Sequence, residues 1–271
     1  MKSAITLSLV PEAAGGPFVF SNGLADGFAR AAKCGFDAVE LFPSSAESLD
    51  SAEVKRLCEQ YKLKVAAIGT GAGWVKHRLR LTDPDIAVRR RAREFIGQIV
   101  DLAAKLAAPA ILGSMQGKWG DGISREQALG WLAEALEELA PRAESHGMPL
   151  LYEPLNRYET NMFNRISDSL EFLEKLRTRN VKVLGDLFHM NIEEPDIPAA
   201  LQLAGQKLGH VHFADSNRRA IGMGHTVMVP VVSALREIGY NGYLSAEIFP
   251  LPDADQAAAQ TISSFRQLIG K

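Results

Sequence analysis

Short runs of apolar and β-branched residues alternate along the chain with longer stretches whose apolar positions recur at helical spacing. This alternation continues to the C-terminus without a linker and is typical of an α/β fold with a parallel sheet. Strands are predicted at residues 4–10, 37–41, 64–68, 110–113, 149–153, 181–186, 208–213 and 243–247. Helices are predicted at residues 22–34, 51–61, 84–106, 124–146, 167–177, 197–206, 229–238 and 253–269. Eight such units predict a closed (β/α)8 barrel with the helices outside.

Capping residues mark several helix ends. Asp83 stands as an N-cap before Pro84, and Ser124 with Gln127 matches a capping box. Glycines stand where three helices should end, namely Gly35, Gly147 and Gly239. These signals support the predicted helix boundaries.

An open, doubly wound sheet is the rival architecture, and it normally carries a glycine-rich phosphate turn after its first strand. Gly15 and Gly16 follow that strand here, but without the spacing of a dinucleotide fingerprint. Gly69, Gly71 and Gly73 follow the third strand, which is the wrong place for that motif. We interpret this glycine run as a flexible loop over the barrel mouth and retain the TIM-barrel prediction.

The composition fits one domain that spans residues 1–271, because 46% of the chain is hydrophobic and 23% is charged. The net charge is -2, and the one basic cluster, Arg89, Arg90, Arg91 and Arg93, is predicted on a surface helix. A nucleic-acid partner would need a broader basic face. The N-terminal apolar run at 4–10 is too short to span a membrane.

The chain contains two cysteines, Cys34 and Cys58, and they lack the spacing of a metal or redox motif. We therefore expect free thiols and a cytoplasmic protein without a nucleic-acid or membrane partner.

An ionisable side chain closes each of the last four predicted strands, in the order Glu153, Asp186, His212 and Glu247. The carboxyl ends of barrel strands meet at one mouth, so these four groups should converge there. Three carboxylates without a counter-charge would repel one another, and a divalent cation removes that repulsion. Three oxygen ligands and one nitrogen suit Mn²⁺, Mg²⁺ or Co²⁺, with Zn²⁺ as an alternative. We expect one ion, with Mn²⁺ favoured.

Two further polar residues lie on these strands. His210 should face the same side as His212 but one layer deeper, as a core or supporting residue rather than a ligand. Glu40 closes the second predicted strand, where it either supports the site or forms a separate ion pair.

At these residues the chain resembles the xylose isomerase-like barrels, and among them the ketose 3-epimerases of the D-tagatose/D-allulose type. Glu153-Pro154-Leu155-Asn156-Arg157-Tyr158-Glu159 resembles a metal-ligand strand end with its following substrate-contact glutamate. Asp186 with His189, and His212 with Arg218, resemble two further ligands, each with a sugar-contacting residue. Glu247 resembles the last ligand. Residues 11–20 and 69–74 depart from the family pattern, so the resemblance specifies the metal site more sharply than the sugar.

The resemblance implies that Glu153 and Glu247 exchange a proton with a small keto-sugar through an enediolate, one as base and the other as acid. It also implies that Glu159, His189 and Arg218 orient the sugar hydroxyls, and that the enzyme is a homo-oligomer, either a dimer or a tetramer. Trp119 either covers the sugar or packs within its loop. A phosphorylated substrate stays open, because Arg218 or Lys118 offers a cation for phosphate.

Other functions use the same residues. The metal and carboxylates would also serve an aldose–ketose isomerase of the hydroxypyruvate isomerase type, or a keto-inositol isomerase or dehydratase. A metal-dependent endonuclease of this fold is disfavoured by the six histidines and the lack of a basic groove. A barrel that binds sugar without turnover is the non-enzymatic alternative.

Overall fold

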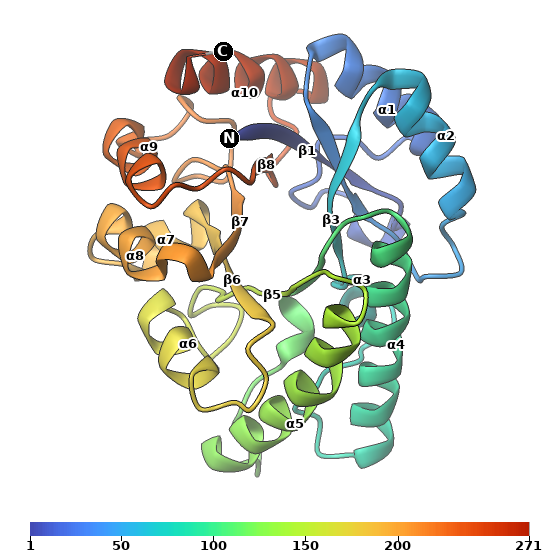
Figure 1. The fold of residues 1–271 in the computed structure, drawn as a ribbon, viewed down its shortest axis with the longest axis vertical. Coiled ribbons are helices and arrows are strands. Elements are labelled where there is room, and N and C mark those ends of the chain that lie inside the picture. The colour runs from blue at the N-terminus through green and yellow to red at the C-terminus, as the bar shows by residue number, and fades with distance from the viewer. Residues whose placement is uncertain (271) are drawn as a thin grey trace.

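The computed structural model describes residues 1–270, and these residues form a closed barrel of eight parallel strands in the order β1 to β8. The strands are β1 Lys2–Ser8, β2 Ala38–Phe42, β3 Lys64–Gly69, β4 Ala110–Leu112, β5 Leu150–Tyr152, β6 Val181–Asp186, β7 Leu208–His212 and β8 Tyr243–Ala246. β8 pairs with β1 and closes the ring. The helices surround this ring (Figure 1). The predicted (β/α)8 TIM barrel is confirmed.

The eight predicted helices are present in residues 1–270, with ends shifted by a few residues. They are α1 Leu24–Cys34, α2 Ser51–Tyr61, α4 Ile86–Lys105, α5 Arg125–Glu144, α6 Ile166–Leu173, α8 Ile197–Ala204, α9 Met228–Glu237 and α10 Ala254–Ile269. Two short helices were not predicted, α3 Ala72–Val75 and α7 Leu187–Glu193, together with the 3-10 turns Pro11–Ala13, Ser114–Gln116 and Gly205–Lys207. The prediction of a flexible loop at the glycine run is wrong, because Gly69 ends β3 and Gly73 lies within α3.

The capping predictions have mixed outcomes. Ser124 and Gln127 form the predicted capping box at the start of α5. The N-cap predicted at Asp83 is wrong, because α4 begins at Ile86 and the Asp85 carboxylate accepts the Ala87 N–H at 2.8 Å. Asp83 instead accepts the N–H of Asp85 at 3.0 Å, so it builds the turn that precedes the cap.

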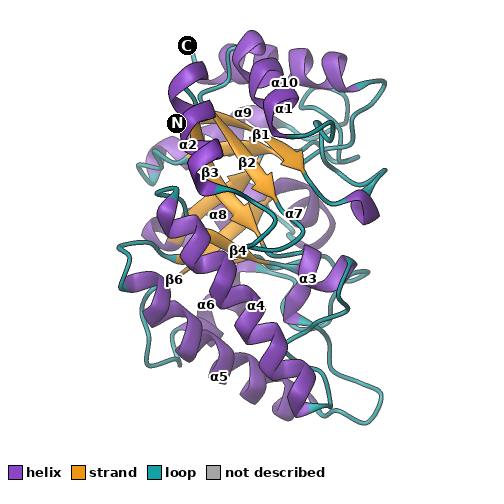
Figure 2. Ribbon diagram, turned by 90° about the vertical axis from the view of Figure 1, so that its right-hand side faces the viewer, coloured by secondary structure: helices purple, strands orange, loops and turns teal. Residues whose placement is uncertain are grey.

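The strands lie inside a layer of helices (Figure 2), and buried apolar side chains form the core of this arrangement. Inside the barrel a separate apolar layer contains Ala67, Ile111, Leu151 and Leu184. Leu151 lies two residues before Glu153, and Leu184 lies two residues before Asp186. Because side chains alternate along a strand, this layer lies directly beneath the acidic strand ends and supports them.

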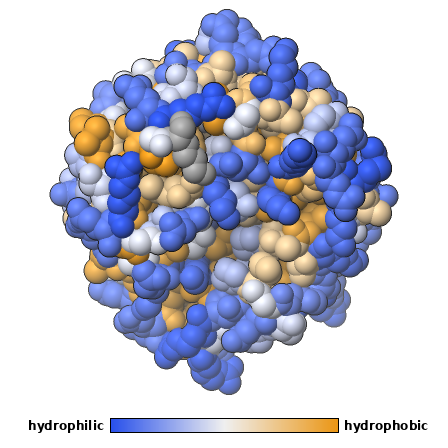
Figure 3. All heavy atoms as spheres, turned by 45° about the horizontal axis from the view of Figure 1, so that its top comes forward, coloured by the Kyte–Doolittle hydropathy of each residue, from blue (hydrophilic) through white to orange (hydrophobic). Residues whose placement is uncertain are grey.

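The surface differs from the expectation at one arginine. Arg89 is 8% exposed, and its guanidinium lies 3.9 Å from the centre of the Trp131 ring, so it is not part of an exposed basic cluster. Hydrophilic residues cover most of the face drawn in Figure 3, with smaller apolar patches between them. Within residues 1–270 no helix combines the length and apolar character that a membrane span requires.

Candidate active site

The four strand-end residues meet at one rim of the barrel. Glu153 follows β5, Asp186 ends β6, His212 ends β7 and Glu247 follows β8. One carboxylate or imidazole atom from each lies within 4.8 Å of the others. The predicted convergence of these side chains is thus present in the structure, and their role as metal ligands stays a prediction.

The Asp186 carboxylate divides its two oxygens between a helix and this cluster. Oδ1 accepts the N–H of Phe188 at 2.7 Å and caps the start of α7. Oδ2 lies 3.2 Å from His212 Nδ1 in the cluster. The cap therefore fixes the direction of the second oxygen, which stays available for a cation.

His212 lies at the centre of the cluster. Its Nδ1 atom is 3.2 Å from Glu153 Oε1 and 3.7 Å from Glu247 Oε2. On the other side of the ring, Nε2 lies 3.1 Å from Glu40 Oε1. The second Glu40 oxygen lies 2.7 Å from His210 Nε2. Glu40 thus supports the site from behind, which the sequence left open, and His210 lies in the deeper layer as predicted.

Buried polar atoms without hydrogen bonds converge on the cluster. Among residues 1–270, Glu153 Oε1, His189 Nε2 and Arg218 Nε are buried and lack a hydrogen-bond partner. Buried polar groups in native proteins are nearly always paired, so these three atoms indicate that a ligand binds here. Three carboxylates and an outward-facing Nδ1 form a donor set that fits a divalent cation.

Charge and burial shift the pKa values of the clustered groups. Burial raises the pKa of Glu247, and nearby Glu153 and Asp186 add to the rise against the opposing charges of Arg218 and His212, which leaves it at about 7. Burial lowers the pKa of His212, but Glu40, Glu247 and Glu153 outweigh burial and raise it well above its ordinary value. The metal-free site therefore holds protons at neutral pH.

We expect the metal-free protein to lose stability as the pH rises through neutrality. The Glu247 pKa rises from 4.5 to about 7 on folding, so the folded state binds more protons than the unfolded chain between these values. The raised pKa of His212 acts in the same direction. Its contribution to the free energy of unfolding is fully present below pH 6.5 and is lost as the pH rises through the pKa of His212 in the folded protein. Thermal unfolding of EDTA-treated protein between about pH 5 and about pH 8 measures this trend.

A Glu247→Gln variant is the control for this trend, since it removes one of the two titrating groups and should flatten the profile. A bound cation should also flatten it, because the cation replaces the protons. A metal-free melting temperature that rises over this pH range would contradict the expectation.

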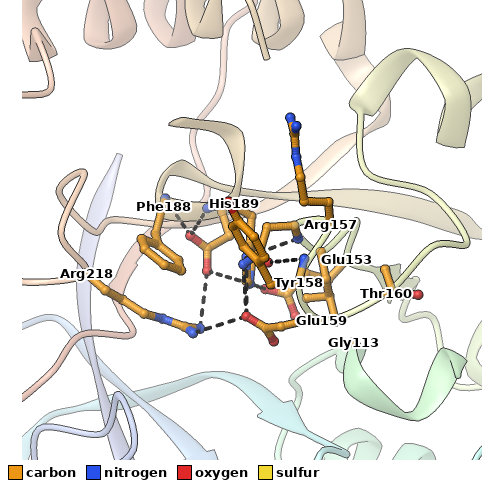
Figure 4. A network of polar contacts seen from close by, with 12 residues as sticks. Gly113, Glu153, Arg157, Tyr158, Glu159, Thr160, Phe188, His189 and Arg218 are labelled. Atoms are coloured by element: carbon orange, nitrogen blue, oxygen red, sulfur yellow. Dashed lines mark hydrogen bonds and ion pairs between the residues drawn. The ribbon is translucent and has the colours of Figure 1, made fainter. Parts of the chain in front are cut away.

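Three residues predicted to contact substrate, Glu159, His189 and Arg218, lie beside the cluster, and Figure 4 shows them near Glu153. Arg218 donates a hydrogen bond to Glu247, and its guanidinium lies 3.7 Å from Glu159 and 3.8 Å from Asp186. His189 Nε2 lies 3.7 Å from Asp186 Oδ2 and 4.0 Å from Glu153 Oε1. The structure brings all three side chains to the cluster, as predicted, and their contact with substrate stays a prediction.

Asn156 is a further polar residue of the site that was not predicted from the sequence. Its backbone N–H donates to His189 Nδ1 at 3.3 Å, and its side-chain amide donates to Glu159 Oε1 at 3.0 Å. Because a backbone N–H only donates, Nδ1 is an acceptor and a neutral His189 carries its proton on Nε2, which points toward the cluster. The signal lay in the segment between Glu153 and Glu159, where Asn156 stands midway.

A small cavity of about 50 Å³ adjoins the cluster on the side of β1 to β4. Its walls include the rings of Phe18 and Phe42, which are tilted by 32° with their centres 4.5 Å apart, and the glycines Gly69 and Gly71. Phe18, Gly69 and Gly71 belong to the segments 11–20 and 69–74, where the sequence is expected to depart from the ketose 3-epimerase pattern, whereas Phe42 ends β2.

Trp119 is not among the described residues that line this cavity. Its indole N–H donates to the Asn161 carbonyl at 2.8 Å, and its backbone carbonyl accepts the Asn161 amide at 2.9 Å. These bonds connect Trp119 to the segment between β5 and α6, and cover of the sugar by its indole stays a prediction.

Comparison with known proteins identifies the family. The model of the family described as "Xylose isomerase-like TIM barrel" matches residues 28–268. The chain belongs to this family. Among curated members, this xylose isomerase-like barrel is 32% identical to a D-psicose 3-epimerase of Ruminiclostridium cellulolyticum over 226 residues, which cover 81% of this chain and 76% of the relative. It is 30% identical to an L-ribulose 3-epimerase of Methylomonas sp. over 244 residues, which cover 89% and 83%.

The solved structures agree with this assignment. The xylose isomerase-like barrel superposes on a D-allulose 3-epimerase from Methylomonas sp. in complex with D-allulose with a TM-score of 0.81 at 26% identity. The match covers 99% of this chain and 98% of that one. These three relatives are epimerases, which are enzymes of the isomerase class.

Proposed function

We propose that this protein is a divalent-metal-dependent ketose 3-epimerase in which Glu153, Asp186, His212 and Glu247 hold the ion, with Mn²⁺ favoured. The observation that carries this proposal is the convergence of four ligand atoms from consecutive strand ends within 4.8 Å, where buried Glu153 Oε1 accepts no hydrogen bond within the described residues. The epimerase relatives support the reaction class. We further propose that residues 1–271 act as one domain.

Epimerisation beside a ketone removes a carbon-bound proton on one face of the substrate and returns a proton on the other face. When bound, the divalent ion supplies a Lewis acid that stabilises the negative charge of the enediolate. Glu153 and Glu247 extend from non-adjacent strands, and each has a second carboxylate oxygen that can exchange a proton with substrate. One acts as the base and the other as the acid.

The polar side chains around these carboxylates orient the sugar. His189 offers an N–H at Nε2, Arg218 offers its unpaired Nε–H, and Glu159 offers carboxylate oxygens to hydroxyl groups. A carbon-bound proton is acidic only when its bond is aligned with the carbonyl π system, so these contacts determine which proton is removed.

Solvent exchange tests the proposal. In D₂O with Mn²⁺, the enzyme should place deuterium on C3 of D-psicose or L-ribulose and form the C3 epimer, and EDTA should abolish both until Mn²⁺ is restored. Deuterium on C1 with formation of an aldose would instead establish an aldose–ketose isomerase. No exchange into ketoses or inososes with saturating Mn²⁺, Co²⁺ or Zn²⁺ would refute an epimerase or isomerase function.

We expect Glu40→Gln to weaken Mn²⁺ binding by a factor of about 10–100, because groups behind a ligating histidine orient it and raise its basicity. The Glu40 carboxylate contacts both His212 Nε2 and His210 Nε2, whereas glutamine offers one acceptor oxygen and one donor. Calorimetric titration of the metal-free protein with Mn²⁺ measures the change, and Glu59→Gln on the exposed face of α2 is the matched control. An unchanged affinity would show that Glu40 does not orient His212.

A further inference from the structure

The segment 215–226, here called the arginine loop, connects β7 to α9 and folds around one buried carboxylate. Asp215 is 1% exposed. Its Oδ1 accepts the backbone N–H groups of Ser216 at 2.7 Å and Thr226 at 3.0 Å. Its Oδ2 accepts those of Gly222 at 2.8 Å and Gly224 at 2.9 Å. One side chain therefore connects the beginning of the loop to its far end.

Arg218 is part of this loop and adopts an uncommon backbone conformation. Its φ angle is 56°, which lies in the left-handed region. Residues other than glycine adopt this conformation only when the surrounding structure enforces it. The Arg218 N–H donates to the Asp215 carbonyl at 2.8 Å, and its own carbonyl accepts the Phe249 N–H at 2.8 Å. The loop thus determines the direction in which the Arg218 side chain extends from the backbone.

Gly224 lies so close to this carboxylate that a side chain at position 224 would collide with it. A Cβ atom on Gly224 would lie 2.3 Å from Asp215 Oδ1 and 2.6 Å from Ser216 Oγ. Burial raises the pKa of Asp215, but the four backbone N–H bonds outweigh burial and lower it. Asp215 is therefore charged at neutral pH and is held by main-chain donors.

The guanidinium that this loop presents contacts groups from three other strands. It reaches Glu247 after β8, Asp186 at the end of β6 and Glu159 after β5. Its distal nitrogens are committed to these carboxylates, while buried Nε has no partner among residues 1–270. A small rotation of the loop would move all of these contacts together.

We propose that Asp215 is a positioning residue of the reaction, whose carboxylate holds the arginine loop in the conformation that directs Arg218 toward Glu247, Glu159 and the substrate. This inference rests on the proposed epimerase function and adds a residue that acts only through Arg218. Asp215 then influences alignment of the sugar without contributing to the affinity for the ion.

A double-mutant cycle tests the proposal. Asp215→Ala and Arg218→Ala should each lower kcat/KM for C3 exchange by about 10²-fold, since a misplacement of 1 Å is sufficient for such a loss. If Asp215 acts through Arg218, the double variant should be no worse than Arg218→Ala alone. The Kd of Asp215→Ala for Mn²⁺ should stay within about twofold of the wild-type value.

A second variant repeats the test with the carboxylate in place. Gly224→Ala inserts the clashing Cβ atom and should reproduce the loss of kcat/KM. In the Arg218→Ala background it should cause no further loss. This variant tests the proposal even if Asp215→Ala does not fold. Asp50→Ala removes a carboxylate that caps α2 outside the barrel and is the control for general destabilisation, with kcat/KM unchanged.

Two results with an active wild-type enzyme would overturn this inference alone. One is a kcat/KM loss in the double variants equal to the product of the losses in the single variants, and the other is a loss of Mn²⁺ affinity in Asp215→Ala as large as its loss of kcat/KM. Wild-type protein that binds Mn²⁺ but exchanges no substrate proton would overturn the proposed function and this inference with it.

Discussion

Glu247→Gln is expected to lower kcat for C3 epimerisation by a factor of about 10²–10⁴, and Glu153→Gln by a similar factor, since each removes one partner of a proton-transfer pair. Glutamine preserves the shape of the side chain and one ligand oxygen, but it neither accepts nor delivers a proton at neutral pH. The measurement is the rate of epimer formation at Mn²⁺ concentrations that saturate each variant.

Isotope exchange distinguishes proton transfer from loss of metal. In a two-carboxylate scheme each side chain serves one face of the substrate, so a variant should exchange the proton of one C3 epimer and fail with the other. Glu126→Gln on the exposed face of α5 is the matched control. Near-normal epimerisation by either variant with metal bound would contradict the assignment of both glutamates.

Strand order explains why the sequence predicted the cluster so well. Glu153, Asp186, His212 and Glu247 follow apolar strand segments directly, and closure of a parallel barrel brings all such ends to one rim. The prediction needed no knowledge of loops, because the strand period alone determines which residue faces inward.

The residues that the sequence did not resolve depend on contacts between distant segments. Glu40 lies on β2 and reaches histidines on β7 across the barrel interior, a distance that periodicity cannot predict. Arg89 stands in a run of arginines, yet it packs on Trp131 of the neighbouring helix α5. Both positions depend on tertiary packing, which overrides the local pattern.

Asp215 shows a second limit of sequence interpretation. Its partners are backbone N–H groups, which every non-proline residue has, so no side-chain motif marks them. The interpretation of Asp83 as a cap failed for a related reason, because both Asp83 and Asp85 accept backbone N–H groups and only the geometry shows which one begins the helix.

Gly113→Ala is expected to lower kcat/KM by about 10²-fold, because the new methyl group would displace the Glu153 carboxylate. A Cβ atom on Gly113 would lie 2.4 Å from Glu153 Oε2, well inside van der Waals contact. Gly113 follows β4 at the barrel mouth, so the clash comes from the neighbouring strand and pushes the carboxylate toward the other ligands. Steady-state kinetics and Mn²⁺ titration measure the loss.

Gly130→Ala is the matched control for this effect. Gly130 lies in α5 with open space where a Cβ atom would be, so alanine should raise the free energy of unfolding by about 1 kcal/mol and leave kcat/KM unchanged. The contrast separates the general effect of alanine from the position of Glu153. If Gly113→Ala retained wild-type kinetics, Glu153 would function equally well from a displaced position, and close placement of the four strand ends would not be what determines the rate.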